Sequence, residues 1–561
     1  MSIPATSLSP SELQKAARDH LWLHFTRMSS YRDAEIPVIV RGDGCYLEDS
    51  NGKRYLDALA GLFAVNIGYG FGEEMGEAAA AQMRELPFYT NWSYAHPRAI
   101  ELAAELASLA PGDLNRVFFV SGGSEAVESA WKLARQYHAA RGERRWKAIA
   151  RRIAYHGTTM GALSINGIPA LRTPFEPLVP EVHHVRNTNR YHRPPEETEE
   201  QFTSFLLDEL EQTIEAAERM IPGARIEEQL THERRWKAIS RHIAYHGTTM
   251  GALSINGIPA LRTPFEPLVP EVGHVRNTNR FHRPTEETEE QFTAMLLDDL
   301  EHAIEALGPE TVAMVIMEPV QNAGGAFTPP EGYWRGVREI CDRYDILLCA
   351  DEVITAFGRL GHWFGSDRYD IRPDLVTMAK GLSSAHAAIG GVIARDSVME
   401  PFLQGSSMYS HGITFGGHPV MCAIALKNIE IMKRERIVEH VKSNEDRFRE
   451  TLAQLLDLPI AGDLRGTGFF YALELVKDKE TRQTFTDDES EWLLRGFLSK
   501  RLFEAGLICR ADDRGDPVIQ ISPPLVAGQE EFDKIASILG EVLEEAWAEL
   551  EKGRGRALAQ A

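Results

Sequence analysis

Apolar and polar positions alternate along this chain in two patterns, one typical of helices and one typical of buried strands. Apolar residues recur with helical spacing over residues 11–27, 97–109, 125–141 and 333–343. Between these segments lie apolar runs too short for helices: Val117 to Val120, Val312 to Met317, Ile346 to Ala350 and Leu375 to Met378. Short buried runs interleaved with helices are typical of a mainly parallel sheet covered by helices. The pattern therefore predicts an α/β fold.

The two ends of the chain differ from this central pattern. Residues 38–56 contain short extended runs broken by Gly42, Gly44 and Asn51-Gly52, which is a hairpin signature. Residues 421–561 alternate helical segments with short strands. We expect residues 61–395 to form a large domain, and residues 1–60 and 396–561 to contribute a smaller α/β domain.

A long repeat interrupts the large domain. Residues 143–217 recur almost verbatim as residues 233–307, at an offset of 245 − 155 = 90 positions, with eleven differences. Solenoid units diverge from one another and about three are needed for a continuous core. Two near-identical copies instead indicate a recent tandem duplication or an error in the gene model. Removal of one copy leaves 561 − 90 = 471 residues.

Composition excludes several classes of protein. Hydrophobic residues make up 43% of the chain and charged residues 25%, as in ordinary globular proteins. The net charge of −22 argues against binding to nucleic acid or to an anionic membrane surface. Five scattered cysteines without CxxC spacing suit a reducing compartment. The chain shows neither a signal-peptide pattern nor an apolar run of about 18 residues, so a cytoplasmic location is expected.

Polar residues follow three of the predicted strands. Ser121-Gly122-Gly123-Ser124 opens a helix after the first run, and the amides of such a turn suit a phosphate group. Asp351 and Lys380 follow two later runs. Taken singly, each is more often a capping or solvated turn residue. Because ligands bind at the carboxyl ends of parallel strands, the three features together favour one site. A carboxylate and a lysine beside a phosphate-holding turn are what a pyridoxal cofactor needs.

Six sequence motifs, in order and suitably spaced, resemble the class III aminotransferases. They are Phe119-Val-Ser-Gly-Gly-Ser-Glu-Ala126, Tyr155-His-Gly157, Met317-Glu-Pro-Val320, Ala350-Asp-Glu-Val-Ile-Thr355, Ala379-Lys-Gly381 and His411-Gly-Ile-Thr-Phe415. The resemblance covers nearly the whole chain once one repeat copy is discounted. It implies a fold-type I transferase that depends on pyridoxal 5'-phosphate (PLP).

The resemblance also implies roles for individual residues around PLP. Lys380 would carry the cofactor as a Schiff base and act catalytically, while Asp351 would pair with the pyridine nitrogen. The remaining contacts would come from the phosphate-holding Gly123 and Ser124, from Val353 and Tyr155 at the ring faces, from His156 beside Tyr155, from Glu318 near the cofactor hydroxyl, and from Thr414 reaching the neighbouring subunit's phosphate. The last role implies a homodimer with shared active sites.

Two further regions resemble the branch that moves amino groups from ω-amino acids or amines to pyruvate or another keto acid. Residues 59–66 and 86–89 would wall the substrate pocket, chiefly through Phe63 and Tyr89. Arg510 would bind the keto acid carboxylate, a task that suits a planar guanidinium. The implied reaction is a ping-pong transamination with donors such as β-alanine or a putrescine-like diamine. The alternatives are other PLP chemistry, as in an aminomutase or decarboxylase, and a protein inactivated by the duplication.

Each repeat copy contains a Tyr-His-Gly loop, but one active site holds only one loop. The occupants are Tyr155 and His156 or, alternatively, Tyr245 and His246. The first copy is synthesised first and follows an intact helix junction, so folding order favours it. His242 and His246 have the spacing of zinc ligands on a helix, but they flank Ile243-Ala-Tyr245, which is expected to be a strand. No metal site is therefore predicted.

Overall fold

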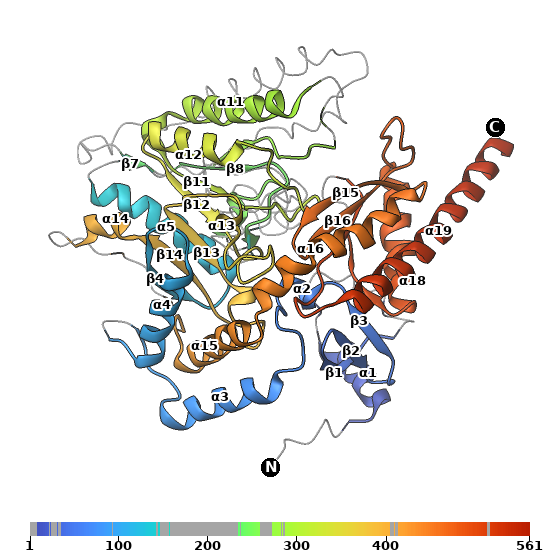
Figure 1. Ribbon diagram of the computed structural model, residues 1–561, viewed down its shortest axis with the longest axis horizontal. Helices are drawn as coiled ribbons and strands as arrows, with labels where there is room; N and C mark the ends of the chain where they lie inside the picture. The colour runs from blue at the N-terminus through green and yellow to red at the C-terminus, as the bar shows by residue number, and fades with distance from the viewer. Residues whose placement is uncertain are drawn as a thin grey trace.

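The computed structural model describes most of the chain outside the first repeat copy. The described residues are 8–21, 35–91, 94–141, 237–248, 250–258, 272–281, 287–403, 415–512 and 516–560, with short stretches at 23, 31, 144–145, 156–157, 234–235, 283, 409 and 413. Figure 1 shows a large sheet with its covering helices beside a smaller lobe, which holds the hairpin near the N-terminus and the long C-terminal helix.

A seven-stranded sheet forms the centre of the large part. Its strand order is β10 (Val272–Val275), β8 (Lys237–Arg241), β11 (Val312–Met317), β12 (Leu347–Asp351), β13 (Leu375–Met378), β14 (Gly390–Arg395) and β4 (Leu114–Val120). Neighbours from β10 to β13 run parallel, whereas β14 is antiparallel to both β13 and β4. The mainly parallel α/β sheet is confirmed, and β11 and β13 match the expected bounds.

Helices lie around this sheet (Figure 1). They are α4 (Pro97–Leu109), α5 (Gly123–Ala140), α9 (Met250–Ser254), α11 (Glu289–Leu307), α12 (Tyr333–Arg343), α13 (Gly365–Arg368) and α14 (Asp396–Met399). Helix α12 buries Trp334, Val337 and Ile340 on one face, as its apolar spacing predicts. Helix α11 begins at a capping box in which Thr288 and Gln291 satisfy each other's backbone N–H groups.

The expected hairpin near the N-terminus is present and joins a strand from the other end of the chain. Strands β1 (Ile39–Asp43), β2 (Tyr46–Asp49) and β3 (Arg54–Asp57) form an antiparallel meander, and β17 (Leu507–Ile508) pairs in parallel with β3. Gly44 and Gly52 form the two turns with φ of 54° and 80°, a conformation that glycine adopts without strain. The domain boundaries themselves stay a prediction.

The C-terminal part contains a four-stranded antiparallel sheet in the order β15 (Ala461–Thr467), β16 (Phe470–Leu475), β19 (Val518–Ile521) and β18 (Arg510–Asp512). Its helices are α16 (Ile437–Ala453), α17 (Asp487–Glu491), η9 (Trp492–Leu498), α18 (Ser499–Glu504) and α19 (Gln529–Gln560). Helices α3 (Gly72–Glu85) and α15 (Pro419–Arg434) lie together below the large sheet in Figure 1. Among the described helices, none combines the length and apolarity needed to cross a membrane.

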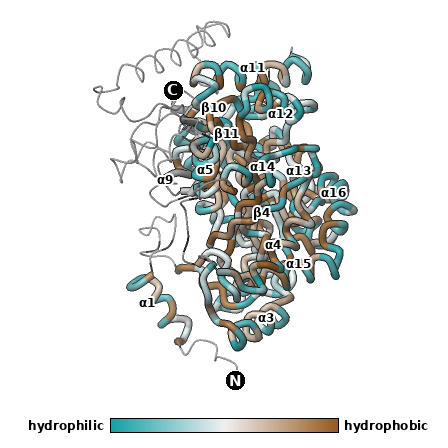
Figure 2. The backbone as a smooth tube through the Cα atoms, turned by 90° about the vertical axis from the view of Figure 1, so that its left-hand side faces the viewer, coloured by the Kyte–Doolittle hydropathy of each residue, from teal (hydrophilic) through white to brown (hydrophobic). Residues whose placement is uncertain are grey.

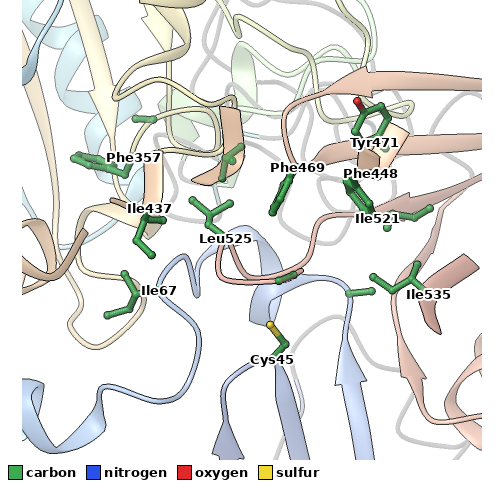
Figure 3. Close-up of a cluster of buried hydrophobic side chains, with 14 of the residues drawn as sticks. Cys45, Ile67, Phe357, Ile437, Phe448, Phe469, Tyr471, Ile521, Leu525 and Ile535 are labelled. Carbon is green, nitrogen blue, oxygen red and sulfur yellow. The ribbon is translucent and has the colours of Figure 1, made fainter. Parts of the chain in front are cut away.

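A large apolar cluster joins the small lobe to the large part. The cluster contains Phe448, Phe469 and Tyr471 of the C-terminal part together with Cys45 of the N-terminal hairpin and Phe357 of the large part (Figure 3). The side view in Figure 2 shows hydrophobic chain concentrated inside the described body, with hydrophilic segments at its edges. Burial of these rings stabilises the lobe against the sheet by the usual area term, about 25 cal/mol per Å².

A buried arginine ties the same parts together by hydrogen bonds. Arg359 donates to the backbone carbonyls of Phe469 (3.2 Å) and Pro523 (2.6 Å) and to the side-chain oxygen of Asn66 (3.1 Å). Loss of hydration lowers the pKa of its guanidinium to about 9, opposed by the charge of Asp57. The C-terminal strands are therefore held in a defined position against the large sheet.

The second repeat copy supplies two strands of the seven-stranded sheet, β8 and β10. Residues of this copy form β8, α9, β10 and α11, and Gly308 with the short 3-10 helix η5 (Pro309–Thr311) connects α11 to β11. The first copy is described only at β5 (Arg144–Arg145) and β6 (His156–Gly157), which pair in parallel with β7 (Arg234–Arg235) and β9 (Gly247–Thr248). From folding order we expected the first copy to occupy the site, but in the structure the second copy lies in the sheet. The short connection from α11 to β11 brings the second copy next to the sheet, because consecutive elements tend to be neighbours in space.

Deletion of residues 143–232 should leave the fold intact. The shortened chain keeps every strand of the seven-stranded sheet and both of its edges. We expect its midpoint of thermal unfolding to lie within about 3 °C of the full chain's, a shift worth roughly 1 kcal/mol for domains of this size. The matched deletion of residues 218–307 replaces the second copy by the first, which differs from it at eleven positions, including the buried Ser240, His242 and Gly273. This chain should unfold at a clearly lower temperature. Equal unfolding temperatures of the two 471-residue chains would contradict this account.

Candidate functional site

The loops that follow four parallel strands meet at one edge of the sheet. Glu318 follows β11, Asp351 ends β12, Lys380 follows β13, and the turn after β8 leads to Tyr245 and His246. Because β8, β11, β12 and β13 are consecutive in the sheet, these residues are neighbours. The edge is the one at which open α/β sheets bind ligands.

Asp351 is the most constrained group at this edge. One carboxylate oxygen accepts hydrogen bonds from the Thr377 hydroxyl (3.1 Å) and the Val353 N–H (3.3 Å). The other oxygen shares a hydrogen bond with Nδ1 of His246. Burial raises the pKa of Asp351 to about 7, and the negative charge of Glu318 adds to this shift. The carboxylate is thus oriented, dry and receptive to a cationic partner.

Glu318 connects the β8 loop to the same edge. Its carboxylate lies 3.5 Å from Nη2 of Arg241 and 3.6 Å from Nε2 of His246, and it accepts the N–H of Tyr245 at 3.2 Å. The His246 ring therefore lies between the carboxylates of Glu318 and Asp351. Contacts to both ring nitrogens fix the orientation of the imidazole.

The expected strand at residues 243–245 is wrong. Strand β8 ends at Arg241, and His242 and Ile243 form a turn in which Ile243 has φ of 68°. This conformation is strained for a β-branched residue. The Ile243 side chain is buried with Ala323 and Phe327, and this burial offsets the backbone strain. The turn directs the chain toward Glu318. Periodicity missed the turn because its residues are as apolar as those of a strand.

Lys380 has a left-handed backbone conformation and a side-chain amine with a lowered pKa. It opens the short helix η6 (Lys380–Leu382) with φ of 40°, in the left-handed region where non-glycine residues are strained. Loss of hydration lowers the pKa of Lys380 to about 8; the charge of Asp351 opposes this shift and that of Arg510 adds to it. Arg510 at the start of β18 is thereby placed within electrostatic reach of the lysine. A larger share of the amine is neutral near pH 8 than for an ordinary lysine.

The glycine turn lies beside these groups. A Cβ at Gly123, the first residue of α5, would fall 2.8 Å from Cγ1 of Val353 and 3.7 Å from Cβ of Ala379. Only glycine allows the start of α5 to approach the Asp351 and Lys380 segments this closely. The N–H groups of the first turn of α5, including that of Ser124, therefore belong to the same edge.

The structure brings most of the expected residues together, but not all in the expected form. Phe63 is buried in a small core cluster and packs edge-on against Phe470, with ring centroids 5.8 Å apart. Tyr89 is exposed and pairs with Tyr94 at 5.3 Å. Tyr155 and Thr414 lie outside the described residues, as does the side chain of His156.

Several residues of this edge escaped the sequence interpretation. Thr377 is a hydroxyl inside the apolar run of β13, and it is the register partner of Asp351. A polar residue in a buried strand is a usable signal, because buried hydroxyls require partners. Arg241 gives no such signal, since its partner Glu318 is 77 residues away. Within the described residues, no cluster of His, Cys, Asp and Glu is arranged to hold a metal ion.

Comparisons with known proteins agree on one family. The family model described as aminotransferase class III matches residues 29–221 and 211–543. A probable aminotransferase of Mycobacterium tuberculosis is 45% identical over 97% of this chain and 96% of its own length. A putrescine–pyruvate aminotransferase of Pseudomonas aeruginosa is 34% identical over 98% of this chain and 99% of its own.

Solved structures of similar proteins share the fold. A thermostable (S)-enantioselective omega-transaminase from Thermomicrobium roseum has a TM-score of 0.77 and 32% identity, covering 96% of this chain and all of its own. An omega-transaminase from Pseudomonas jessenii in complex with PMP has a TM-score of 0.73 and 28% identity, covering 95% of this chain and 98% of its own.

The side-chain amine of Lys380 should lose its proton at a lower pH than an ordinary lysine amine. With a pKa near 8, the amine is about half neutral at pH 8, whereas an ordinary lysine reaches this point near pH 10.4. Trace acetylation of the protein without added ligands, followed by mass spectrometry, should therefore show the Lys380 labelling rate approaching its plateau by about pH 9. Exposed Lys500 serves as the reference. In Asp351→Asn the Lys380 midpoint should move lower still, because the charge of Asp351 raises it. A Lys380 rate that climbs in parallel with the Lys500 rate up to pH 10 contradicts the assignment.

Proposed function

The chain belongs to the class III aminotransferases, enzymes of fold type I that depend on PLP, and we propose that it transfers an amino group from an amine or ω-amino acid to pyruvate. The observation that carries the proposal is the convergence of Lys380, Asp351 and the charge of Arg510 at one edge of the sheet.

The residues present fit PLP. The carboxylate of Asp351 is buried and has its pKa raised to about 7, so a protonated ring nitrogen is the kind of partner that keeps it ionised. The missing side chain of Gly123 leaves the start of α5 close to Val353, where backbone amides suit a phosphate. When bound, PLP supplies the electron sink that accepts the charge left by proton removal from the amine carbon.

Residues of the protein bind the cofactor and transfer the proton. We propose that Lys380 carries the cofactor and moves a proton through Nζ, which is neutral often enough near pH 8 to accept one. Asp351, which Thr377 and His246 orient, would pair with the ring nitrogen and keep it protonated. Glu318 keeps the Tyr245 and His246 loop in place.

The remaining cofactor contacts are proposals of the same kind. Gly123 and Ser124 would bind the phosphate, Val353 would pack on one ring face and Tyr245 would lie at the ring. Thr414 would reach the phosphate of a partner subunit.

Arg510 is the proposed carboxylate-binding group. A guanidinium can bind the two oxygens of pyruvate in parallel, and such charge-assisted pairs are stronger than neutral hydrogen bonds. The electrostatic influence of Arg510 on Lys380 supports this role, since a keto acid must reach both residues. The putrescine–pyruvate aminotransferase among the relatives supports pyruvate as acceptor and a diamine as one donor.

We also infer that the repeat is a tandem duplication with one redundant copy. The first family-model match ends at residue 221, just after the first copy, and the second match begins at residue 211 and contains the whole second copy, which supports two versions of one segment.

The proposed reaction is tested with purified holoenzyme, pyruvate and a panel of donors that includes putrescine and β-alanine. We expect alanine to form with at least one donor, and Lys380→Ala to form none. Arg510→Ala should raise the KM for pyruvate at least ~10-fold with a smaller change in kcat, because one charged hydrogen-bond pair is worth roughly 1.5–3 kcal/mol.

Other results would assign other chemistry. Release of CO₂ or isomerisation of the donor without alanine formation would favour a decarboxylase or an aminomutase. Absence of any turnover by a PLP-loaded protein would mean that the duplication inactivates it.

We further propose that two copies of the chain form a homodimer. Phe88, Tyr89, Tyr94 and Phe415 are all exposed by 40% or more, which is unusual for a group of aromatic residues. Phe88 contacts Phe415 with ring centroids 5.8 Å apart, so these residues form a contiguous surface. Phe415 follows Thr414, the residue expected to act in the partner subunit. A second copy would bury this surface.

Sedimentation velocity should show a dimer for the parent chain. The paired substitutions Phe88→Glu and Phe415→Glu should yield monomer, because two charges would be buried at the interface. Leu403→Glu, at an exposed apolar residue outside this aromatic group, is the matched control and should stay dimeric. A monomeric parent chain would contradict the proposal.

A further inference from the structure

We infer that three positions in the repeat decide which copy supplies the active-site loop: Ser240, His242 and Gly273 admit the second copy, and their counterparts Ala150, Arg152 and His183 bar the first. The inference deepens the proposed function, because it names residues that position His246, and through it Asp351.

A polar network behind His246 contains two of these positions. The Ser240 hydroxyl donates to the Ile255 carbonyl at 2.6 Å, and the next residue, Asn256, accepts the His246 N–H through its side chain. The Asn256 carbonyl in turn lies 3.0 Å from Nε2 of His274, whose ring stacks on His242 with centroids 5.8 Å apart. Residues of β8, β10 and the segment after α9 thus hold the loop that reaches Asp351.

The first copy lacks the hydroxyl at the start of this network. Ser240 is fully buried and its counterpart is Ala150. In the same position, alanine would leave the counterpart of the Ile255 carbonyl without its donor in a dry environment, which is unfavourable. The segment that carries the Asn256 counterpart would then lose its anchor to the strand.

The charge at the next position separates the copies further. His242 is buried directly after Arg241, whose guanidinium is already matched to Glu318. The first copy has Arg151 and Arg152 at these two positions. A second arginine is always charged, is larger than histidine and would be buried beside the first without a second carboxylate from Glu318. Arg152 therefore suits this position poorly.

The third position is steric. Gly273 is a buried residue of β10 and pairs in register with Ile239 of β8. Its counterpart is His183, so the first copy would introduce an imidazole into a packed strand. Some other differences between the copies lie at exposed positions of α11, where Ala294 and His302 replace Ser204 and Gln212.

The two copies lie close enough to compete. The backbone of His156–Gly157 pairs in parallel with Gly247–Thr248, and Arg144 pairs with its own counterpart Arg234. The loop of the first copy is thus beside the position it would have to occupy. Sequence, rather than distance, then decides between them.

The first test removes the working loop in the full chain. His246→Ala leaves the first copy intact with His156. If the first copy is barred, this single change lowers kcat/KM and PLP affinity at least ~10-fold. Activity equal to that of the parent chain would mean that the first copy replaces the second freely, and would overturn the inference.

The second test gives the first copy the three residues of the second copy. Adding Ala150→Ser, Arg152→His and His183→Gly to the His246→Ala chain should restore activity to within about threefold of the parent. The same three changes with His246 intact are the matched control and should leave activity unchanged. Failure of the repaired chain to recover would show that these positions do not decide the choice.

Hydrogen exchange with mass spectrometry gives a readout that needs neither PLP nor turnover. Peptides of the two copies differ in mass at residues 150 and 240 in the parent chain and, in the repaired chain, at His156 and the substituted position 246, so protection of each can be followed separately. Protection should cover residues 237–246 in the parent and move to residues 147–156 in the repaired chain. Protection that stays on the second copy overturns the inference. A parent chain with protected residues 237–246 but no transaminase activity would instead count against the proposed function alone.

Discussion

The burial of one carboxylate organises this site. Asp351 ends the central strand β12, and its two oxygens are used by Thr377, Val353 and His246. Each partner comes from a different segment: the neighbouring strand, the following turn and the loop after β8. A dry carboxylate must be either satisfied or neutralised, so every one of these segments has to be in place before the site exists. The raised pKa of Asp351 and the lowered pKa of Lys380 are two consequences of the same dehydration.

The small lobe enters the site through this electrostatic coupling. Arg510 belongs to the C-terminal sheet, yet its charge contributes to the lowered pKa of Lys380 in the large part. The relative position of the two parts is held by the shared apolar cluster and by Arg359, which reaches carbonyls at residues 469 and 523. The buried guanidinium of Arg359 holds the two parts in one relative position, because the loss of any of its three acceptors would leave a buried charged N–H group without a hydrogen bond. Substrate recognition and cofactor chemistry are thereby joined across the lobe boundary.

The repeat makes the dependence on distant contacts unusually clear. The loops at Tyr155 and Tyr245 have identical sequences from Ile153 to Asn166 and from Ile243 to Asn256, so their local propensities are the same. Only the second loop is described against Glu318 and Asp351. The difference must therefore arise outside the loop, in the strand before it, in β10 beside it and in the connection to β11. Active-site geometry here is a property of the support behind the loop rather than of the loop itself.

The sequence by itself determined the elements whose signals are local. The apolar runs of β11 and β13, the helices 97–109 and 333–343, and the glycine turns of the N-terminal hairpin follow from periodicity and turn chemistry, and each was predicted within a few residues. The residues after the strand ends also identified Asp351 and Lys380, because parallel strands deliver their ends to one edge. Tertiary structure alone decided the turn at Ile243, the placing of His246 between two carboxylates and the burial of Phe63. These features depend on contacts between residues up to several hundred positions apart. The free energy of such contacts cannot be inferred from a short stretch of sequence.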